Sequence, residues 1–321
     1  MSGNLVEIPI IEFDRFSKGN TESQNIVADQ IYDACHKIGF MYLKSNKISS
    51  TLIAQVFGQS QLFFNLPLPI KNRLSWSDEF SNRGYVAVER EKLNIHRPGD
   101  LKEAFNIGKE VDRNQLTTQK EQANLILNQW PTELTGFRET MLEFYQACSE
   151  FVQTLCQAFA LALKLPDNFF TSNHNQQEHT LRLLHYPPLK ESSKPGQIRA
   201  GEHSDYGSFT LLFQDEVGGL EVCTVNEEWV AAPSIPGTIV VNTGDLMQRW
   251  TNHVFCSTKH RVIIPNDDRI NLSRYSIAFF CHPNNDTQIS CIESCQDINH
   301  PPLYSPISAG DYLISRLQAS Y

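Results

Sequence analysis

Between residues 200 and 285 the chain consists of short apolar runs separated by residues that favour turns. The runs, rich in aromatic and β-branched side chains, cover 208–214, 220–224, 228–232, 238–242, 260–265 and 274–281. Gly218-Gly219, Pro236-Gly237 and Gly244-Asp245 lie between them. Such runs predict strands, and many short strands in succession indicate a β-sandwich or barrel rather than a parallel sheet.

Three other segments have the apolar spacing of amphipathic helices. They cover residues 25–38, 50–64 and 132–163, and Pro166 is expected to end the last of them. The length of the third segment suggests a helix lying along the outside of the β core. We therefore expect a mainly β fold with flanking helices.

His203 and Asp205 stand two residues apart at the start of the strand-rich region, and His260 follows in a later strand. In extended backbone, positions i and i+2 point to the same face, so this imidazole and this carboxylate can converge. Two imidazoles and one carboxylate form the facial triad typical of non-haem Fe(II) oxygenases, with the other metal positions left open. A closed structural zinc site would need a fourth protein ligand.

Arg274 and Ser276 obey the same period of two, so both side chains should point inward together. A buried arginine needs an anionic partner, and no fixed acidic residue stands beside this one in the sequence. The guanidinium fork can hold a carboxylate bidentately, and a neighbouring hydroxyl can donate to the same group. The expected guest is a dicarboxylate that has one end on the metal and the other on Arg274.

These motifs resemble those of the iron(II)- and 2-oxoglutarate-dependent oxygenases of the isopenicillin N synthase-like superfamily, whose pattern is His-x-Asp, a distal His and Arg-x-Ser. The resemblance covers nearly the whole chain. Further matching segments, in the family's order, are residues 8–13, 39–43, 63–67 with Lys71, 83–85, 102–105, 181–188, 241–246 and 274–283.

The resemblance implies a double-stranded β-helix (jelly-roll) core and assigns roles to several residues. His203, Asp205 and His260 would bind Fe(II). Arg274 and Ser276 would bind the distal carboxylate of 2-oxoglutarate, and Tyr186 would donate a hydrogen bond to its metal-binding end. With O2 as the oxidant, such an enzyme hydroxylates, desaturates or cyclises a small molecule and releases succinate and CO2.

The chain departs from several plant members of the family at Leu184, where they carry asparagine two residues before the tyrosine. An amide contact to the co-substrate is therefore absent or supplied from elsewhere. By analogy with the family, Tyr85, Phe105 and Phe280 are expected to line the substrate pocket. The C-terminal residues 311–321 are expected to close over its mouth as a helix.

We expect the 321 residues to form a single globular unit (1–321). Within it, an N-terminal oxygenase region would cover 6–120, the jelly-roll core 178–285 and a C-terminal segment 286–321. A net charge of −9 argues against a nucleic-acid partner, and no apolar run is long enough to span a bilayer. No obligatory protein partner is evident, the location is expected to be cytoplasmic, and the eight cysteines are expected to be mostly buried thiols.

Three alternatives stay open at this point. Isopenicillin N synthase and aminocyclopropane-carboxylate oxidase keep the same metal ligands yet do not consume 2-oxoglutarate. A non-catalytic protein could bind iron or a small ligand in the same cavity. A zinc hydrolase fits least well, because no general base is evident beside the triad and Arg274 would have no role.

Overall fold

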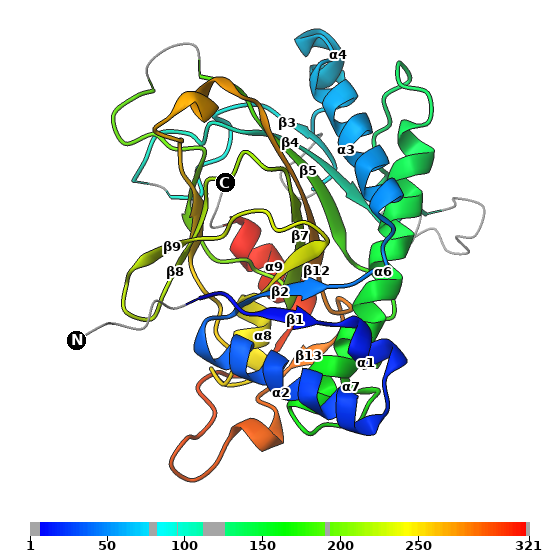
Figure 1. Ribbon diagram of the computed structural model, residues 1–321, viewed down its shortest axis with the longest axis vertical. Coiled ribbons are helices and arrows are strands. Elements are labelled where there is room, and N and C mark those ends of the chain that lie inside the picture. Colours follow the sequence, from blue (N-terminus) through cyan, green and yellow to red (C-terminus); the bar gives the residue numbers. More distant parts are fainter. Residues whose placement is uncertain (1–6, 77–81, 95, 112–125, 190–192, 319–321) are drawn as a thin grey trace.

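Two facing β-sheets dominate the computed structural model of the protein, which describes residues 7–76, 82–94, 96–111, 126–189 and 193–318 (Figure 1). The larger sheet has the strand order β1-β2-β10-β7-β12-β5-β4-β3. Its strands are β1 (Ile10–Glu12), β2 (Phe40–Lys44), β3 (Gly84–Val86), β4 (Glu103–Gly108), β5 (Thr180–Tyr186), β7 (Phe209–Gln214), β10 (Thr238–Thr243) and β12 (Arg274–Cys281).

The smaller sheet has the order β6-β11-β8-β9 and covers one face of the larger sheet. Its strands are β6 (Ala200–His203), β8 (Leu220–Cys223), β9 (Trp229–Ala231) and β11 (His260–Val262). The strands expected from the apolar runs are therefore present, with ends shifted by a few residues at most. The pairing of the two sheets around an internal cavity is the jelly-roll arrangement, so the expected fold class is confirmed.

Alternation along β12 separates the two faces of the larger sheet. Its odd-numbered residues, Tyr275, Ile277, Phe279 and Cys281, belong to the core cluster that packs against the helices. Its even-numbered residues, Arg274, Ser276, Ala278 and Phe280, line a cavity between the sheets. The period of two thus places both Arg274 and Ser276 on the cavity side.

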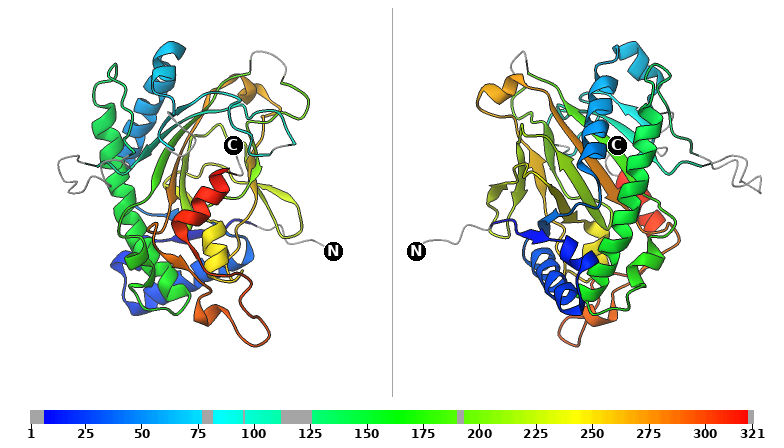
Figure 2. Two further views of the ribbon diagram at one scale, coloured as in Figure 1. Left: turned by 180° about the vertical axis from the view of Figure 1, so that it is seen from behind. Right: turned by 45° about the vertical axis from the view of Figure 1, so that its right-hand side comes forward.

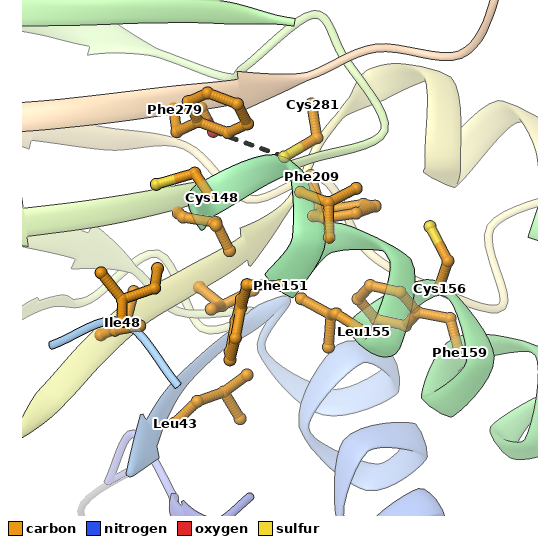
Figure 3. Packing of buried hydrophobic residues seen from close by; sticks show 14 of the residues in the cluster. Leu43, Ile48, Cys148, Phe151, Leu155, Cys156, Phe159, Phe209, Phe279 and Cys281 are labelled. Carbon is orange, nitrogen blue, oxygen red and sulfur yellow. Dashed lines mark hydrogen bonds between the residues drawn. The ribbon is translucent and has the colours of Figure 1, made fainter. Parts of the chain in front are cut away.

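Helices cover the outer face of the larger sheet (Figures 1 and 2). They are α1 (Asp14–Lys18), α2 (Thr21–Lys37), α3 (Ser50–Phe64), α4 (Leu68–Arg73), α6 (Phe137–Ala162) and α7 (Phe169–Asn173). Figure 3 shows Phe151, Leu155 and Phe159 of α6 among side chains of the sheet. The helices pack against one face of the larger sheet through this apolar layer, and the polar groups lie on the opposite face.

Two helix boundaries differ from the expected ones. The helix expected over 132–163 begins only at Phe137, because Gly136 before it has a left-handed backbone (φ 78°) that interrupts a helix. The helix expected over 25–38 begins earlier, at Thr21, because the Asn20 side chain accepts a hydrogen bond from the Ser23 amide and caps it. Helix α3 has the expected bounds.

The C-terminal part of the chain returns to the open end of the sheets. It contains α8 (Asp245–Trp250), η2 (Asp268–Asn271), β13 (Gln288–Ile289), η3 (Glu293–Cys295), β14 (Ile307–Ser308) and α9 (Ala309–Gln318). Figure 2 shows α9 beside α8 in the view from behind. No helix among the described residues combines the length and apolar composition needed to cross a membrane.

Candidate active site

The two histidines of the proposed triad lie on paired strands of the smaller sheet. His203 ends β6 and faces His260, the first residue of β11, as its direct cross-strand partner. Asp205 follows two residues after His203. One side-chain atom from each of the three residues lies within 4.8 Å of the others, with Asp205 Oδ1 4.0 Å from His203 Nε2 and 3.7 Å from His260 Nε2. The structure thus brings together the three residues selected from the sequence.

Backbone carbonyls fix the orientation of both imidazoles. His203 Nδ1 donates to the Gly201 carbonyl at 2.8 Å, and His260 Nδ1 donates to the Thr258 carbonyl at 3.1 Å. Because Nδ1 carries the proton in each ring, Nε2 has a free lone pair. This tautomer is the one that a metal-binding histidine requires when its other nitrogen donates a hydrogen bond.

Hydrogen bonds from two side chains orient the Asp205 carboxylate. Its Oδ2 accepts hydrogen bonds from Thr210 Oγ1 at 2.6 Å and from Asn242 Nδ2 at 2.8 Å, which leaves Oδ1 facing the histidines. Burial opposes the ionised form, but His260, His203 and these two hydrogen bonds outweigh it and hold the pKa of Asp205 below its ordinary value. Burial, together with the neighbouring His260, lowers the pKa of His203 to about 3. At neutral pH the site therefore offers a neutral imidazole at His203 and a carboxylate at Asp205, as a divalent metal requires.

Arg274 lies in the same cavity and is only 1% exposed. Its Nη1 donates to Ser276 Oγ at 3.3 Å, its Nη2 donates to Gln214 Oε1 at 3.1 Å, and its Nε has no partner in the described part of the chain. No carboxylate among the described residues forms an ion pair with it. The guanidinium carbon lies 4.7 Å from the centre of the Tyr186 ring, so the tyrosine packs against this group. An arginine buried in this way can bind an anionic guest.

One cavity of about 860 Å³ joins the triad to Arg274. Both sheets line it, and Phe280, Leu184 and Tyr186 are among its wall residues. Gly310, Asp311, Leu313 and Ile314 of α9 also line it, and closure of its mouth by the C-terminal residues 311–321 stays a prediction. The last three residues of that segment, 319–321, lie outside the described part of the chain.

Tyr85 and Phe105 do not line this cavity, so that part of the sequence-based expectation is wrong. The two residues are paired across β3 and β4, are 1% and 0% exposed, and belong to the cluster packed against the helices. Tyr85 Oη donates instead to Glu103 Oε2 at 2.5 Å. The period of two explains the error, since the neighbouring Asn106 of β4 faces the cavity while Phe105 faces the helices.

Comparison with known proteins agrees with this geometry. The model of the 2OG-Fe(II) oxygenase superfamily matches residues 177–283, and a model described as the N-terminal region of non-haem dioxygenases in morphine synthesis matches residues 8–133. A 2-oxoglutarate-Fe(II) type oxidoreductase of Metarhizium majus is 34% identical over 97% of this chain and 94% of its own length. The chain belongs to the 2OG-Fe(II) oxygenase superfamily. It is therefore a 2-oxoglutarate-dependent non-haem iron dioxygenase, and the resemblance drawn from its motifs is confirmed.

Two further relatives of this oxygenase differ in what they act on or bind. The crystal structure of a full-length Neurospora crassa protein in complex with alpha-KG has a TM-score of 0.90, 36% identity, and coverage of 100% of this chain and 98% of that one. The same Neurospora protein has been solved with alpha-KG and thymine. A proline hydroxylase of Petromyces alliaceus is 32% identical over 98% of this chain and 100% of its own length.

The donor set of the oxygenase fits Fe(II) better than a structural zinc ion. Among the described residues, the only cluster of three or more possible metal ligands is His203, Asp205 and His260, so a fourth protein ligand is missing there. The three ligands line a cavity that also contains the buried Arg274. This combination suits a metal that binds a co-substrate.

Sequence reasoning missed several polar residues of this cavity. Thr210 and Asn242, which hold Asp205, were assigned no role. A buried network was also missed, in which Lys102 Nζ contacts Asp100 Oδ2 at 2.5 Å and Glu91 Oε2 at 3.2 Å, while Arg182 Nη2 contacts Glu91 Oε2 at 2.6 Å. The sequence did indicate two of these residues, because Arg182 and Asn242 are polar side chains within mostly apolar strands.

Proposed function

We propose that this oxygenase oxidises a small molecule in the cavity between its sheets, with Fe(II) held by His203, Asp205 and His260. Arg274 and Ser276 would bind the 5-carboxylate of 2-oxoglutarate, and Tyr186 would donate a hydrogen bond to the co-substrate. The observation that carries the proposal is the presence, in one cavity, of three oriented metal ligands and a buried arginine with no ion-pair partner among the described residues.

Bound Fe(II) would supply the activation of O2, one atom of which enters succinate as 2-oxoglutarate loses CO2, while the other oxidises the substrate. The residues of the chain position the reactants. Gly201 and Thr258 hold the imidazoles through their carbonyls, and Thr210 with Asn242 holds the carboxylate. The apolar walls and α9 would limit the access of bulk water and with it competing reactions.

The co-substrate separates two rival functions from the dioxygenase. An oxidase that does not consume 2-oxoglutarate would need another anionic guest, such as a substrate carboxylate, on the buried Arg274. A protein that only binds iron would have no need for the space between the triad and Arg274, whereas a non-catalytic binder of a small ligand would fill it without releasing succinate. The similarity to a 2-oxoglutarate-Fe(II) type oxidoreductase and to a Neurospora crassa protein crystallised with alpha-KG favours the dioxygenase.

The identity of the substrate does not carry over from the relatives. One of them is named a proline hydroxylase and another has been solved with thymine, and these are chemically unlike molecules. A fold can host many substrates, so the class must be argued from the cavity itself. The cytoplasmic location, the division of the chain at residues 120, 178 and 286, and the absence of nucleic-acid and obligatory protein partners stay predictions.

The proposal is tested by anaerobic addition of Fe(II) and then 2-oxoglutarate to the purified protein. The chelate formed by the two should give visible charge-transfer absorption at one equivalent per chain. His203→Ala should abolish it, whereas Arg15→Gln, an exposed site on α1 away from the cavity, should leave it unchanged. If the wild-type protein gives no such absorption and releases no succinate from 2-oxoglutarate in air, the proposed chemistry is wrong.

A further inference from the structure

A second arginine lines the cavity and forms no ion pair with any described residue. Arg83 precedes β3, and its guanidinium packs against Gly108 of β4 so closely that an added Cβ there would lie 1.8 to 2.2 Å from the atoms Nη2, Cζ and Nε. Its Nη1 donates to the Asn82 carbonyl at 2.9 Å, while Nε is buried without a partner among the same residues. Burial lowers the pKa of Arg83, while Tyr145 and Glu178 oppose that shift.

Two other cations that line the cavity, Lys102 and Arg182, are paired. Lys102 contacts both Asp100 and Glu91, and Arg182 contacts Glu91. These four residues form a neutral network of two cations and two carboxylates. Glu178 also lines the cavity and acts electrostatically on Arg83, but it forms no ion pair with it. Arg83 and Arg274 therefore share the property that points to an anionic guest.

Two polar groups near Arg83 also lack partners within the described ranges. Asn106 is 1% exposed; its Nδ2 donates to Asn82 Oδ1 at 2.6 Å, and its Oδ1 has no partner there. His282 Nδ1 is buried and has none either. Burial and the positive field of nearby groups, Arg83 among them, lower the pKa of His282 to about 4, so the ring is neutral at pH 7. Unpaired buried polar atoms in a native cavity require an explanation, and a bound ligand provides one.

We infer that the substrate carries a carboxylate that binds Arg83, together with a hydrogen-bond donor that satisfies Asn106 Oδ1. We name Arg83, Asn106 and His282 the Arg83 subsite. This inference rests on the proposed function, because Arg274 at the co-substrate end is reserved for 2-oxoglutarate. The enzyme would then hold one carboxylate at each arginine, and the substrate acid would orient the remainder of the molecule toward the metal.

The test uses the protein loaded with Fe(II) and 2-oxoglutarate without oxygen, so that Arg274 is occupied. The probes are small acids, each paired with its neutral carboxamide: phenylacetate with phenylacetamide, nicotinate with nicotinamide, cyclohexanecarboxylate with its amide, and L-proline with L-prolinamide. Binding is measured by calorimetry and by the shift in melting temperature. We expect at least one acid to bind on the order of tenfold more tightly than its amide, the size expected for a hydrogen bond to a charged group.

Three variants locate the effect. Arg83→Gln should weaken binding of the preferred acid by on the order of 10- to 100-fold and leave its amide unchanged. Gly108→Ala keeps the charge but displaces the guanidinium, so it should also weaken acid binding. Arg15→Gln is the control and should bind the acid normally. The charge-transfer absorption of the Fe(II)–2-oxoglutarate chelate, unchanged in all three variants, shows that each is folded and loaded.

The inference is overturned if no acid is preferred to its amide, if no acid binds, or if Arg83→Gln and Gly108→Ala bind the preferred acid as tightly as the wild type. Its failure is distinct from failure of the proposed function. If only the inference fails, the charge-transfer absorption is present and the preference for an acid is missing. If the proposed function fails, the wild-type protein lacks the absorption itself.

Discussion

The hydrogen bond from Thr210 to Asp205 is predicted to be needed for tight iron binding. Thr210→Val removes the hydroxyl while keeping the shape of a residue that is only 3% exposed. Asp205 Oδ2 would lose its shorter hydrogen bond, at 2.6 Å, and keep the one from Asn242 at 2.8 Å. The carboxylate would then be free to rotate away from the geometry that points Oδ1 at the histidines.

The size of the effect follows from the charge on the acceptor. A hydrogen bond to a charged group contributes about 1.5–3 kcal/mol, which corresponds to roughly a 10- to 150-fold change in an equilibrium constant. Residues that orient metal ligands typically change metal affinity by about 10- to 100-fold when mutated. Because Asn242 still holds the same oxygen, we expect the lower part of this range, on the order of tenfold weaker Fe(II) binding.

Anaerobic calorimetry with Fe(II) measures the affinity, and Thr243→Val provides a matched control. Thr243 is also buried, lies on β10 next to Asn242, and donates to the Cys256 carbonyl at 2.6 Å rather than to a metal ligand. We expect this control to lower the free energy of unfolding by about 1 kcal/mol and to leave Fe(II) affinity unchanged. Equal Fe(II) affinity in Thr210→Val and Thr243→Val would refute the reasoning.

Three further predictions concern other parts of the cavity and core. Arg274→Gln should raise the KM for 2-oxoglutarate by on the order of 100-fold with Fe(II) affinity unchanged, and an unchanged KM in a succinate-release assay would exclude Arg274 as the anchor. Lys102→Met leaves Asp100 without its buried cation and should lower the free energy of unfolding, measured in urea, by about 3–5 kcal/mol. A decrease below about 1 kcal/mol would show that the ion pair of Lys102 with Asp100 does not stabilise the fold. Burial lowers the pKa of His174 to about 4 in the folded protein, so the unfolded chain takes up a proton at a higher pH than the folded chain does, and the free energy of unfolding should fall as the pH drops from about 6.5 to 4. His174→Phe should reduce the slope of the free energy of unfolding against pH in this range by up to about 1.4 kcal/mol per pH unit. An unchanged slope would show that His174 does not titrate in this way.

The metal site could be predicted from the sequence because its geometry is local. The spacing of His203 and Asp205 places both side chains on one side of the chain, and the cross-strand partner of His203 is His260 itself. Arg274 and Ser276 could be predicted in the same way, because they lie two residues apart on one face of β12 and form a hydrogen bond with each other. The apolar run 274–281 indicated the strand that carries Arg274 and Ser276, whereas no such run covers His203 and Asp205, and there the spacing itself suggested extended backbone. In the structure β6 ends at His203, and Asp205 follows it.

The substrate side was predicted less well because it depends on which face of each strand points inward. Phe280 lies on the cavity face of β12, as expected, whereas Tyr85 and Phe105 lie on the helix face of β3 and β4. Aromatic character does not distinguish these two environments, since both are apolar. The roles of Arg83 and Asn106 become visible only once their neighbours are known.

Thr210 and Asn242 show a second limit of the sequence. Each belongs to a strand of the larger sheet, while the carboxylate they hold follows a strand of the smaller sheet. The contact is made only when the two sheets close around the cavity. Spacing along the chain carries no information about such a contact.

The central claim is that His203, Asp205 and His260 hold one iron ion that faces Arg274 across the cavity. Anomalous diffraction at the iron edge, from crystals grown without oxygen with Fe(II) and 2-oxoglutarate, tests it most directly. We predict a single iron peak within bonding distance of His203 Nε2, His260 Nε2 and Asp205 Oδ1, with the far carboxylate of 2-oxoglutarate on Arg274. An iron peak that lacks any of these three ligands, or a co-substrate carboxylate bound away from Arg274, would contradict the claim.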